Sequence, residues 1–255
     1  MIKLEVKRLS YSSIALWNYC PRAWVLRYEY KYKTPASIAQ IFGTAMHKTI
    51  QSSLLENKEL NLFSNYFQNI FYKTMFERPT RARVVDATEA IVLGQQIIDD
   101  PMTNGIFQTI KVKAESQIEH EFKFRVPKVR PPVIGFIDII DNEGIPYDIK
   151  TSAWDWTYER AMDETQPDFY LTALEDEGTP SPGHKFTYII VKKAESPTTY
   201  LIETERPHHR ERSYDLTSDM WNGVKSKLWE SDCTREACKR CEFKNECEKL
   251  KVWLV

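Results

Sequence analysis

Residues 135–150 have the sequence Gly-Phe-Ile-Asp-Ile-Ile-Asp-Asn-Glu-Gly-Ile-Pro-Tyr-Asp-Ile-Lys, and this stretch indicates the fold more clearly than any other. Two isoleucine-rich runs flank an Asp-Asn-Glu-Gly turn, which predicts a hairpin of two strands over residues 133–140 and 145–149. Side chains alternate along a strand, so Asp148 and Lys150 share one face, and Asp138 lies on the neighbouring strand. The sequence therefore predicts two carboxylates and a lysine that converge at one hairpin.

Two carboxylates beside a lysine are the groups that hydrolysis of a phosphodiester needs. A divalent cation held between carboxylates polarises the scissile phosphate and makes a bound water more acidic. A lysine can orient the attacking hydroxide as a compact positive charge. The alternative interpretation of an Asp-x-Lys tripeptide is a strand end that turns polar at the surface. The preceding Gly-x-x-Asp and the hairpin spacing favour a site over that alternative.

The remaining sequence predicts one α/β domain over residues 1–255, with a mixed sheet flanked by helices. A helix is expected over residues 10–19, capped by Ser10 or Ser12, and a second helix is expected to begin at Thr44, with His47 in its first turn. The expected parts are a helical lobe over about 45–110, a catalytic sheet core over about 111–205, and a C-terminal helix with a cysteine segment over about 206–255. Further strands are expected over 112–124, 186–192 and 198–205, and further helices over 158–175 and 214–229.

Four cysteines near the two ends of the chain have the spacing of a metal centre. Cys238, Cys241 and Cys247 form a C-x2-C-x5-C run, and Cys20 stands alone more than two hundred residues earlier. In a reducing compartment, clustered thiols favour a metal over a disulfide. A single distant cysteine fits an iron–sulfur cluster better than zinc, whose short sites mostly pair two C-x2-C hooks, but zinc remains the alternative. Cys233 is interpreted as a spare thiol.

Composition limits the possible partners only weakly. The chain has 35 Lys and Arg residues against 36 Asp and Glu residues, so its net charge does not indicate a nucleic-acid partner. No apolar run approaches the roughly 18 residues of a membrane span, and the first residues lack the apolar region of a signal peptide. We therefore expect a cytoplasmic protein with no membrane partner.

Six motifs occur in an order that resembles one nuclease family. They are Ser10-Tyr11-Ser12-Ser13 before Cys20-Pro21-Arg22, Gly43-Thr44-Ala45-Met46-His47, Gly135-Phe136-Ile137-Asp138, Asp148-Ile149-Lys150, Gln166-Pro167-Asp168-Phe169-Tyr170, and the cysteine run over 238–247. The chain resembles the RecB-like branch of the PD-(D/E)xK nucleases. Within that branch it is similar to the iron–sulfur members: the AddB nuclease domain, CRISPR-associated RecB-like exonucleases and phage relatives. The resemblance implies a restriction-endonuclease-like mixed sheet, with a helical lobe and a C-terminal iron–sulfur segment.

The resemblance also implies roles for single residues. The implied ligands of Mg2+ or Mn2+ are His47, Asp138, Asp148 and the backbone carbonyl of Ile149, and the implied catalytic lysine is Lys150. A histidine ligand favours manganese somewhat over magnesium. Two residues that share a helix face, Gln166 and Tyr170, match the motif that follows the active site. The implied ligands of a [4Fe–4S] cluster are Cys20, Cys238, Cys241 and Cys247.

The activity implied by this resemblance is that of a DNA exonuclease that prefers single-stranded ends. Trp154 and Trp156, just after Lys150, are candidates to stack on unpaired bases. One alternative is a DNA-binding or assembly subunit that cuts little, although an intact set of two aspartates and a lysine argues against it. Another is an endonuclease specific for a DNA sequence or structure. A protein partner in a recombination, CRISPR or phage replication complex is a further expectation.

Overall fold

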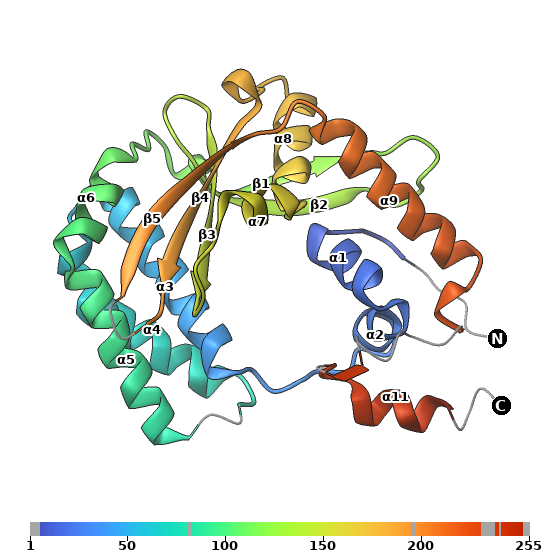
Figure 1. Ribbon diagram of the computed structural model, residues 1–255, viewed down its shortest axis with the longest axis horizontal. Helices are drawn as coiled ribbons and strands as arrows, with labels where there is room; N and C mark the ends of the chain where they lie inside the picture. The colour runs from blue at the N-terminus through green and yellow to red at the C-terminus, as the bar shows by residue number, and fades with distance from the viewer. Residues whose placement is uncertain (1–5, 81–82, 195–196, 231–237, 240, 252–255) are drawn as a thin grey trace. The chain divides into compact units, whose positions relative to one another are not determined.

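The computed structural model describes residues 6–80, 83–194, 197–230, 238–239 and 241–251 (Figure 1). The chain divides into two compact units. The first unit contains residues 1–34, 122–135 and 208–255, and the second contains residues 35–121 and 136–207. The second unit holds every residue of the predicted active site, and the first holds the cysteines predicted to bind a cluster.

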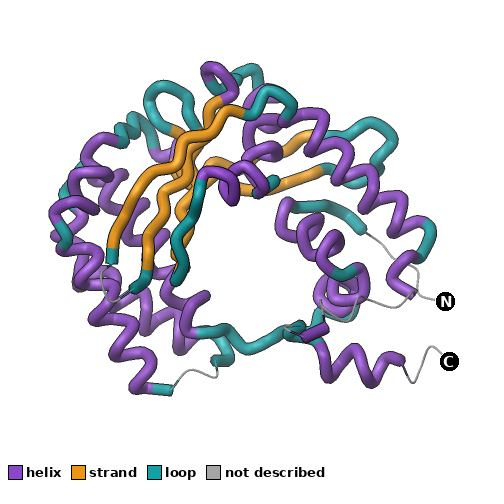
Figure 2. Tube along the Cα trace, in the orientation of Figure 1, coloured by secondary structure: helices purple, strands orange, loops and turns teal. Residues whose placement is uncertain are grey.

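The strands form a five-stranded sheet in the order β1-β2-β3-β4-β5. They are drawn in orange in Figure 2. Strands β2 and β3 are antiparallel, β3 and β4 are parallel, and β4 and β5 are antiparallel, so the predicted mixed sheet is confirmed. The bounds are β1 Ile118–Phe124, β2 Val133–Ile140, β3 Pro146–Ser152, β4 Lys185–Lys192 and β5 Thr198–Glu205. Strand β1 begins six residues later than the expected start at 112, because a 3-10 turn over Glu115–Gln117 precedes it.

Four helices with apolar stripes pack against one face of this sheet. They are α3 Ile38–Glu56, α4 Ser64–Glu77, α5 Val84–Asp99 and α6 Pro101–Thr109, with a 3-10 turn over Leu60–Phe63 between α3 and α4. Their buried side chains form one core with the sheet residues Ile139, Ile149 and Ile189. The expected start of a helix at Thr44 is wrong, because Ser37 and Gln40 form a capping box that begins α3 at Ile38.

The opposite sheet face packs against the crossover that joins the parallel strands β3 and β4. This crossover contains α7 Tyr158–Asp163, α8 Gln166–Asp176 and a 3-10 turn over Pro182–His184. The sequence predicted one helix here, but Pro167 in the first turn of α8 disfavours helical geometry in the residue before it, and the helix breaks. The ring of Tyr170 on α8 lies 6.0 Å from the ring of Phe186 on β4, which fixes α8 against the sheet.

The first unit has its own aromatic core. The indole of Trp17 lies 5.5 Å from that of Trp24 and 6.4 Å from that of Trp229, in edge-to-face geometry. Its elements are α1 Tyr11–Tyr19, α2 Pro21–Trp24, a π-helical turn Val25–Glu29, α9 His209–Lys225, a 3-10 turn Leu228–Glu230 and α11 Lys244–Lys251. Ser10 caps α1 as predicted, whereas α9 begins at His209, five residues before the expected start at 214. Among the described helices, none is long and apolar enough to cross a membrane.

Candidate active site

The turn of the β2–β3 hairpin is built by one carboxylate. Asp141 Oδ1 accepts hydrogen bonds from the backbone N–H groups of Glu143 and Ile145, each at 2.9 Å. Asp141 Oδ2 accepts a further bond of 3.0 Å from the hydroxyl of Tyr147. Gly144 adopts a φ of +82°, the left-handed conformation that glycine tolerates best. This turn sets the register in which Ile139 pairs with Tyr147.

Just beyond that pair, the side chain of Asp138 takes the place of a backbone partner. The backbone N–H of Ile149 donates to Asp138 Oδ2 at 2.9 Å instead of to a carbonyl of β2. A buried N–H must be satisfied, so this bond holds the carboxylate against β3. The hairpin thereby places Asp138 next to the strand that carries Asp148 and Lys150.

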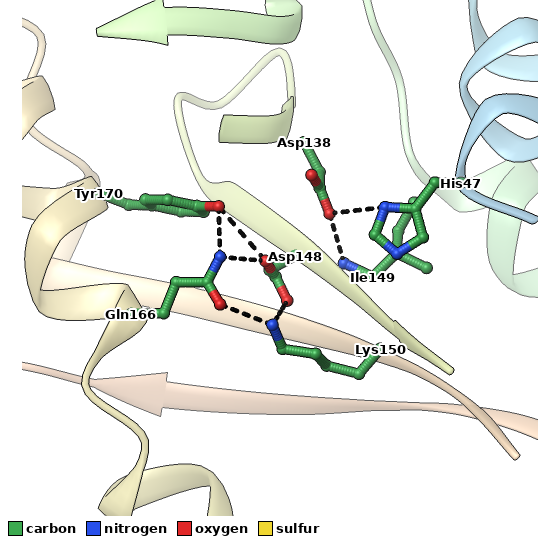
Figure 3. Close-up of polar contacts among 7 residues, drawn as sticks. All are labelled: His47, Asp138, Asp148, Ile149, Lys150, Gln166 and Tyr170. Atoms are coloured by element: carbon green, nitrogen blue, oxygen red, sulfur yellow. Dashed lines mark hydrogen bonds and ion pairs between the residues drawn. The ribbon is translucent and has the colours of Figure 1, made fainter. Parts of the chain in front are cut away.

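Four side chains from β3 and α8 form a closed polar ring (Figure 3). Lys150 Nζ lies 2.7 Å from Asp148 Oδ2 and donates to Gln166 Oε1 at 2.6 Å. Gln166 Nε2 donates to Asp148 Oδ1 at 2.7 Å and to the hydroxyl of Tyr170 at 2.6 Å. The structure thus brings together all four residues, which we call the polar ring. Gln166 and Tyr170 reach it from one face of α8, as their spacing of four predicts.

Burial controls the charge state of the polar ring. Asp148 is only 2% exposed, and its ionised form is compensated by Lys150. Burial, and then the carboxylate of Asp148, raise the pKa of Tyr170 well above its usual value, so the phenol keeps its proton. The hydroxyl of Tyr170 then donates weakly, at 3.4 Å, to Asp148 Oδ1. Among the described residues, Asp148 Oδ2 has the ion pair with Lys150 but no hydrogen-bond partner, so a lone pair is left for a cation.

His47 reaches the same carboxylate from the helical layer. Its Nδ1 lies 3.3 Å from Asp138 Oδ2, and its side chain is 29% exposed. The close approach of α3 to β3 depends on Gly43, because a Cβ atom at that position would lie 3.2 Å from Thr151 Oγ1. His47 lies one helical turn after Gly43 and therefore faces the same strand. It sits in the middle of α3, so the expectation that it lies in a first turn is wrong.

The electrostatics around Asp138 suit a divalent cation. Burial raises the pKa of its carboxyl from 3.8 to about 6; the charge of His47 opposes this rise and the charge of Asp148 adds to it. Two neighbouring carboxylates in a partly buried site disfavour ionisation unless a cation compensates them. Over the described ranges, no three His, Cys, Asp or Glu side chains already form a metal-binding group. The donor set of two carboxylates, an imidazole and a carbonyl nevertheless fits Mg2+ or Mn2+.

Arg206, at the end of β5, is a supporting residue that the sequence did not reveal. It is 2% exposed, and Nη1 donates to the carbonyl of Glu164 at 2.8 Å and lies 3.7 Å from Asp168 Oδ1. A second guanidinium nitrogen donates to the carbonyl of Ala161. These bonds fix the break between α7 and α8 from which Gln166 extends. No local sequence signal could identify this arginine, because its partners lie some forty residues away.

The two tryptophans predicted to stack on bases have different environments. Trp154 is 77% exposed, so its indole is available. Trp156 is 8% exposed, with the guanidinium of Arg160 lying 4.3 Å from its ring and the ring of Tyr188 lying 5.1 Å away. The prediction that Trp156 stacks on DNA is therefore wrong. The period-two pattern of a strand does not apply in the loop, so the sequence could not distinguish the two indoles.

The cysteines lie in the first unit. Cys20 and Cys247 are buried, and they form an apolar cluster with Ala23, Leu26 and Phe243, against which Cys241 also packs. Cys238 lies one turn before Cys241, whose backbone N–H donates to the carbonyl of Cys238 at 3.4 Å. None of these four thiols is in a disulfide. Cys233 lies outside the described residues.

One charged group lies beside these thiols. Arg22 is 5% exposed, and its Nη1 lies 3.9 Å from Cys247 Sγ, within the distance of an N–H···S hydrogen bond. Its Nε also donates to the carbonyl of Trp229 at 3.4 Å. The described thiols share one region, but no three of them are close enough to form a metal-binding group.

Comparisons with known proteins bear on the family and the fold of the chain. The model of the PD-(D/E)XK nuclease superfamily matches residues 8–248. A crystal structure of a candidate exonuclease from Eubacterium rectale superposes with a TM-score of 0.62 at 11% identity, over 96% of this chain and 94% of that one. The crystal structure of SSO0001 covers 88% of this chain and 90% of that one at 15% identity, with a TM-score of only 0.38. No curated protein matches the chain.

The first structural match shows a shared fold, and the family model covers the hairpin, the polar ring and the cysteine segment. Asp138, Asp148 and Lys150 lie within the matched residues, as do the helices that support them. The chain therefore belongs to the PD-(D/E)XK nuclease superfamily.

Proposed function

We propose that the chain is a Mg2+- or Mn2+-dependent DNA exonuclease that acts on single-stranded ends. The observation that carries this proposal is the polar ring, in which a buried aspartate, a lysine, a glutamine and a tyrosine are connected by bonds of 2.6–3.4 Å. A second carboxylate, Asp138, lies on the adjacent strand. The nuclease family supports the hydrolytic chemistry, and the fold shared with a candidate exonuclease is compatible with cutting from an end.

The proposed cation ligands are Asp138, Asp148, His47 and the backbone carbonyl of Ile149. A cation bound there would polarise a phosphate oxygen and make a bound water more acidic. The protein's own contribution is positioning and charge. Gln166 accepts a hydrogen bond from the ammonium of Lys150 and limits its rotation, so that the positive charge can orient an attacking water.

Tyr170 and Lys150 are two ring residues that contact the carboxylate of Asp148 through a proton donor. Tyr170 retains its proton because its pKa is raised, and it donates to Asp148 rather than removing a proton from water. Lys150 Nζ lies 2.7 Å from Asp148 Oδ2, so its positive charge lies directly beside this carboxylate, which is 2% exposed.

We further propose a structural [4Fe–4S] cluster with Cys20, Cys238, Cys241 and Cys247 as ligands. The shared apolar environment of Cys20, Cys241 and Cys247 supports it, because cluster thiolates sit in regions protected from water. Four-thiolate zinc remains the alternative. Iron, sulfide and zinc analysis after anaerobic purification decides between them: about four iron atoms per chain supports the cluster, and zinc without iron rejects it.

The decisive functional experiment compares three end-labelled or closed DNA substrates with Mn2+ present. Linear single strands, linear duplexes and covalently closed circles are digested in parallel. Degradation of linear strands, with closed circles intact, supports the exonuclease. Equal cleavage of closed circles identifies an endonuclease, and binding without cleavage of any substrate identifies a non-cutting assembly subunit.

A further inference from the structure

Residues 152–157, which we call the Trp154 loop, connect the end of β3 to α7. The loop begins two residues after Lys150 and is anchored at both sides of Trp154. The hydroxyl of Ser152 accepts from the backbone N–H of Trp154 at 3.1 Å and donates to the carbonyl of the same residue at 2.7 Å. The carboxylate of Asp155 lies 2.7 Å from Lys192 Nζ on β4. The backbone at Trp154 is therefore fixed on both sides.

The third anchor is Trp156. Its backbone N–H donates to the hydroxyl of Tyr200 on β5 at 2.7 Å, and its indole is buried between Arg160 and Tyr188. Trp154, two residues earlier, keeps its indole 77% exposed. Tryptophan is highly buried on average, so an exposed indole on an anchored loop is unusual. The anchors therefore fix the backbone on both sides of this exposed indole.

The backbone of a lysine, Lys193, is bonded to the first residue of the same loop. Lys193 follows β4, and its backbone N–H donates to the carbonyl of Ser152 at 2.7 Å. Its Nζ lies 5.0 Å from the centre of the Phe42 ring on α3. In the described part of the chain, no carboxylate forms an ion pair with this ammonium. Burial lowers the pKa of Lys193, because its charge is partly removed from water. Such a partly desolvated ammonium binds an anion more strongly than an exposed one does.

We infer that Trp154 and Lys193 form a single-strand binding subsite beside the active site. The indole of Trp154 stacks on an unpaired base, and the ammonium of Lys193 binds a phosphate of the same strand. Lys150 and Trp154 are four positions apart in the chain, which limits their Cα separation to about 14 Å. A strand held by this subsite therefore enters the active site within a few nucleotides. Aromatic stacking next to a backbone cation is the general chemistry of single-strand binding.

This inference rests on the proposed function for its substrate class, DNA. A base inside a duplex is stacked on both faces and offers no face to the indole. Trp154 would therefore discriminate between single strands and duplexes, whereas the phosphate contact of Lys193 would not. The two substitutions should therefore differ in one binding measurement. Loss of Trp154 should weaken the binding of single strands alone, whereas loss of Lys193 should weaken the binding of single strands and duplexes alike.

The test measures binding by fluorescence anisotropy in EDTA, where no cutting occurs. The probes are a labelled twelve-residue oligothymidylate and an abasic strand of the same length and charge. Trp154→Ala is expected to weaken binding of the oligothymidylate by about 5- to 100-fold, with the abasic strand unaffected. Trp154→Phe should recover most of the loss. The matched control is Phe76→Ala, which removes an 81% exposed aromatic side chain from α4.

Lys193→Met tests the cation. It replaces a partly desolvated charge by an apolar side chain of similar length, so the folded protein should be at least as stable as the wild type. Binding of both probes should fall equally, and the slope of log affinity against log salt should decrease by about 0.7. A structural role alone would instead lower the melting temperature and leave the salt slope unchanged.

Two outcomes overturn the inference: unchanged oligothymidylate binding in Trp154→Ala, or an equal loss on the abasic strand. A parallel Mn2+ digestion separates this failure from failure of the proposed function. Wild type that cuts DNA, with Trp154→Ala unaffected in binding, rejects only the subsite. Binding that depends on Trp154, in a protein that cuts no DNA, supports the subsite and rejects the nuclease.

Discussion

The polar ring of the second unit and the cysteine cluster of the first unit are built in opposite ways. The ring residues lie within 22 positions of each other, from Asp148 to Tyr170, and hydrogen bonds join them directly. The thiols come from the two ends of the chain, and Cys20, Cys241 and Cys247 share an apolar cluster. A site of the first kind is organised by the fold itself. At the second site, the proposed cluster would supply the direct links between the thiols.

This difference predicts how each site responds to the loss of its proposed metal. Without the proposed cation, Lys150 still lies beside Asp148, so the geometry of the polar ring should persist. Loss of the proposed cluster would remove a link between chain ends that are 227 positions apart, from 20 to 247.

The largest effect is expected from Lys150→Ala. Loss of the ammonium removes the group proposed to orient the attacking water, and we expect DNA cleavage with Mn2+ to fall by about 10³-fold. DNA binding in EDTA should remain within a few-fold. The matched control is Lys185→Ala, which removes a half-exposed lysine from the start of the neighbouring strand β4. Cleavage by the Lys150 variant at a rate close to that of the control would remove the lysine from the mechanism.

In the first unit, Cys247→Ser should release the proposed cluster. Iron content should fall to background, and the melting temperature should fall by roughly 10 °C, because metal binding contributes directly to folding. Cys233→Ser is the control and should keep both values unchanged. Full iron retention in Cys247→Ser would exclude this thiol as a ligand.

Asp138→Asn should separate charge from structure in the active site. In metal-free protein, folding raises the Asp138 pKa from 3.8 to about 6, so the folded state binds the proton more tightly. This group's contribution to stability is therefore fully present below pH 3.8 and is lost as the pH rises through 6. The asparagine keeps an acceptor for the N–H of Ile149 but carries no charge.

In EDTA at pH 7.5, Asp138→Asn should therefore unfold at higher urea than wild type, by up to about 2–3 kcal/mol, with little difference at pH 4. Added Mn2+ should stabilise the wild type and not the variant. If the variant is less stable than wild type at pH 7.5, favourable contacts already stabilise the ionised carboxylate. The site then needs no cation to compensate that charge.

The smallest effect is expected from Gln166→Leu. The leucine fills a similar volume but cannot hold the ammonium of Lys150, so we expect cleavage to fall by about tenfold. The phenol of Tyr170 and the carboxylate of Asp148 remain. Thr165→Ala, next to it in the chain and without a side-chain capping bond in α8, serves as the control. A loss as large as that of Lys150→Ala would give Gln166 more than a positioning role.

The sequence by itself determined the hairpin and its chemistry. Strand alternation put Asp148 and Lys150 on one face, the Asp-Asn-Glu-Gly turn set the register that brings Asp138 to β3, and helical spacing put Gln166 and Tyr170 together. Each of these results depends on residues close in the chain, where the periods of strand and helix are reliable. Two expected helix bounds were wrong because another local signal acts there. The cap at Ser37 begins α3 before Thr44, and Pro167 lies at the break in the helix expected over 158–175.

Only the tertiary structure decided which side chains are buried and which remote groups meet. It buried Trp156 and exposed Trp154, brought Arg206 to the start of α8, and placed Lys193 over Phe42. It also explains Gly135, because a Cβ there would lie 2.5 Å from the ring of Phe122. These features depend on contacts between distant segments, which sequence periodicity does not encode. The physical reason is that periodicity fixes the direction of a side chain relative to its own element, whereas packing fixes what that side chain meets.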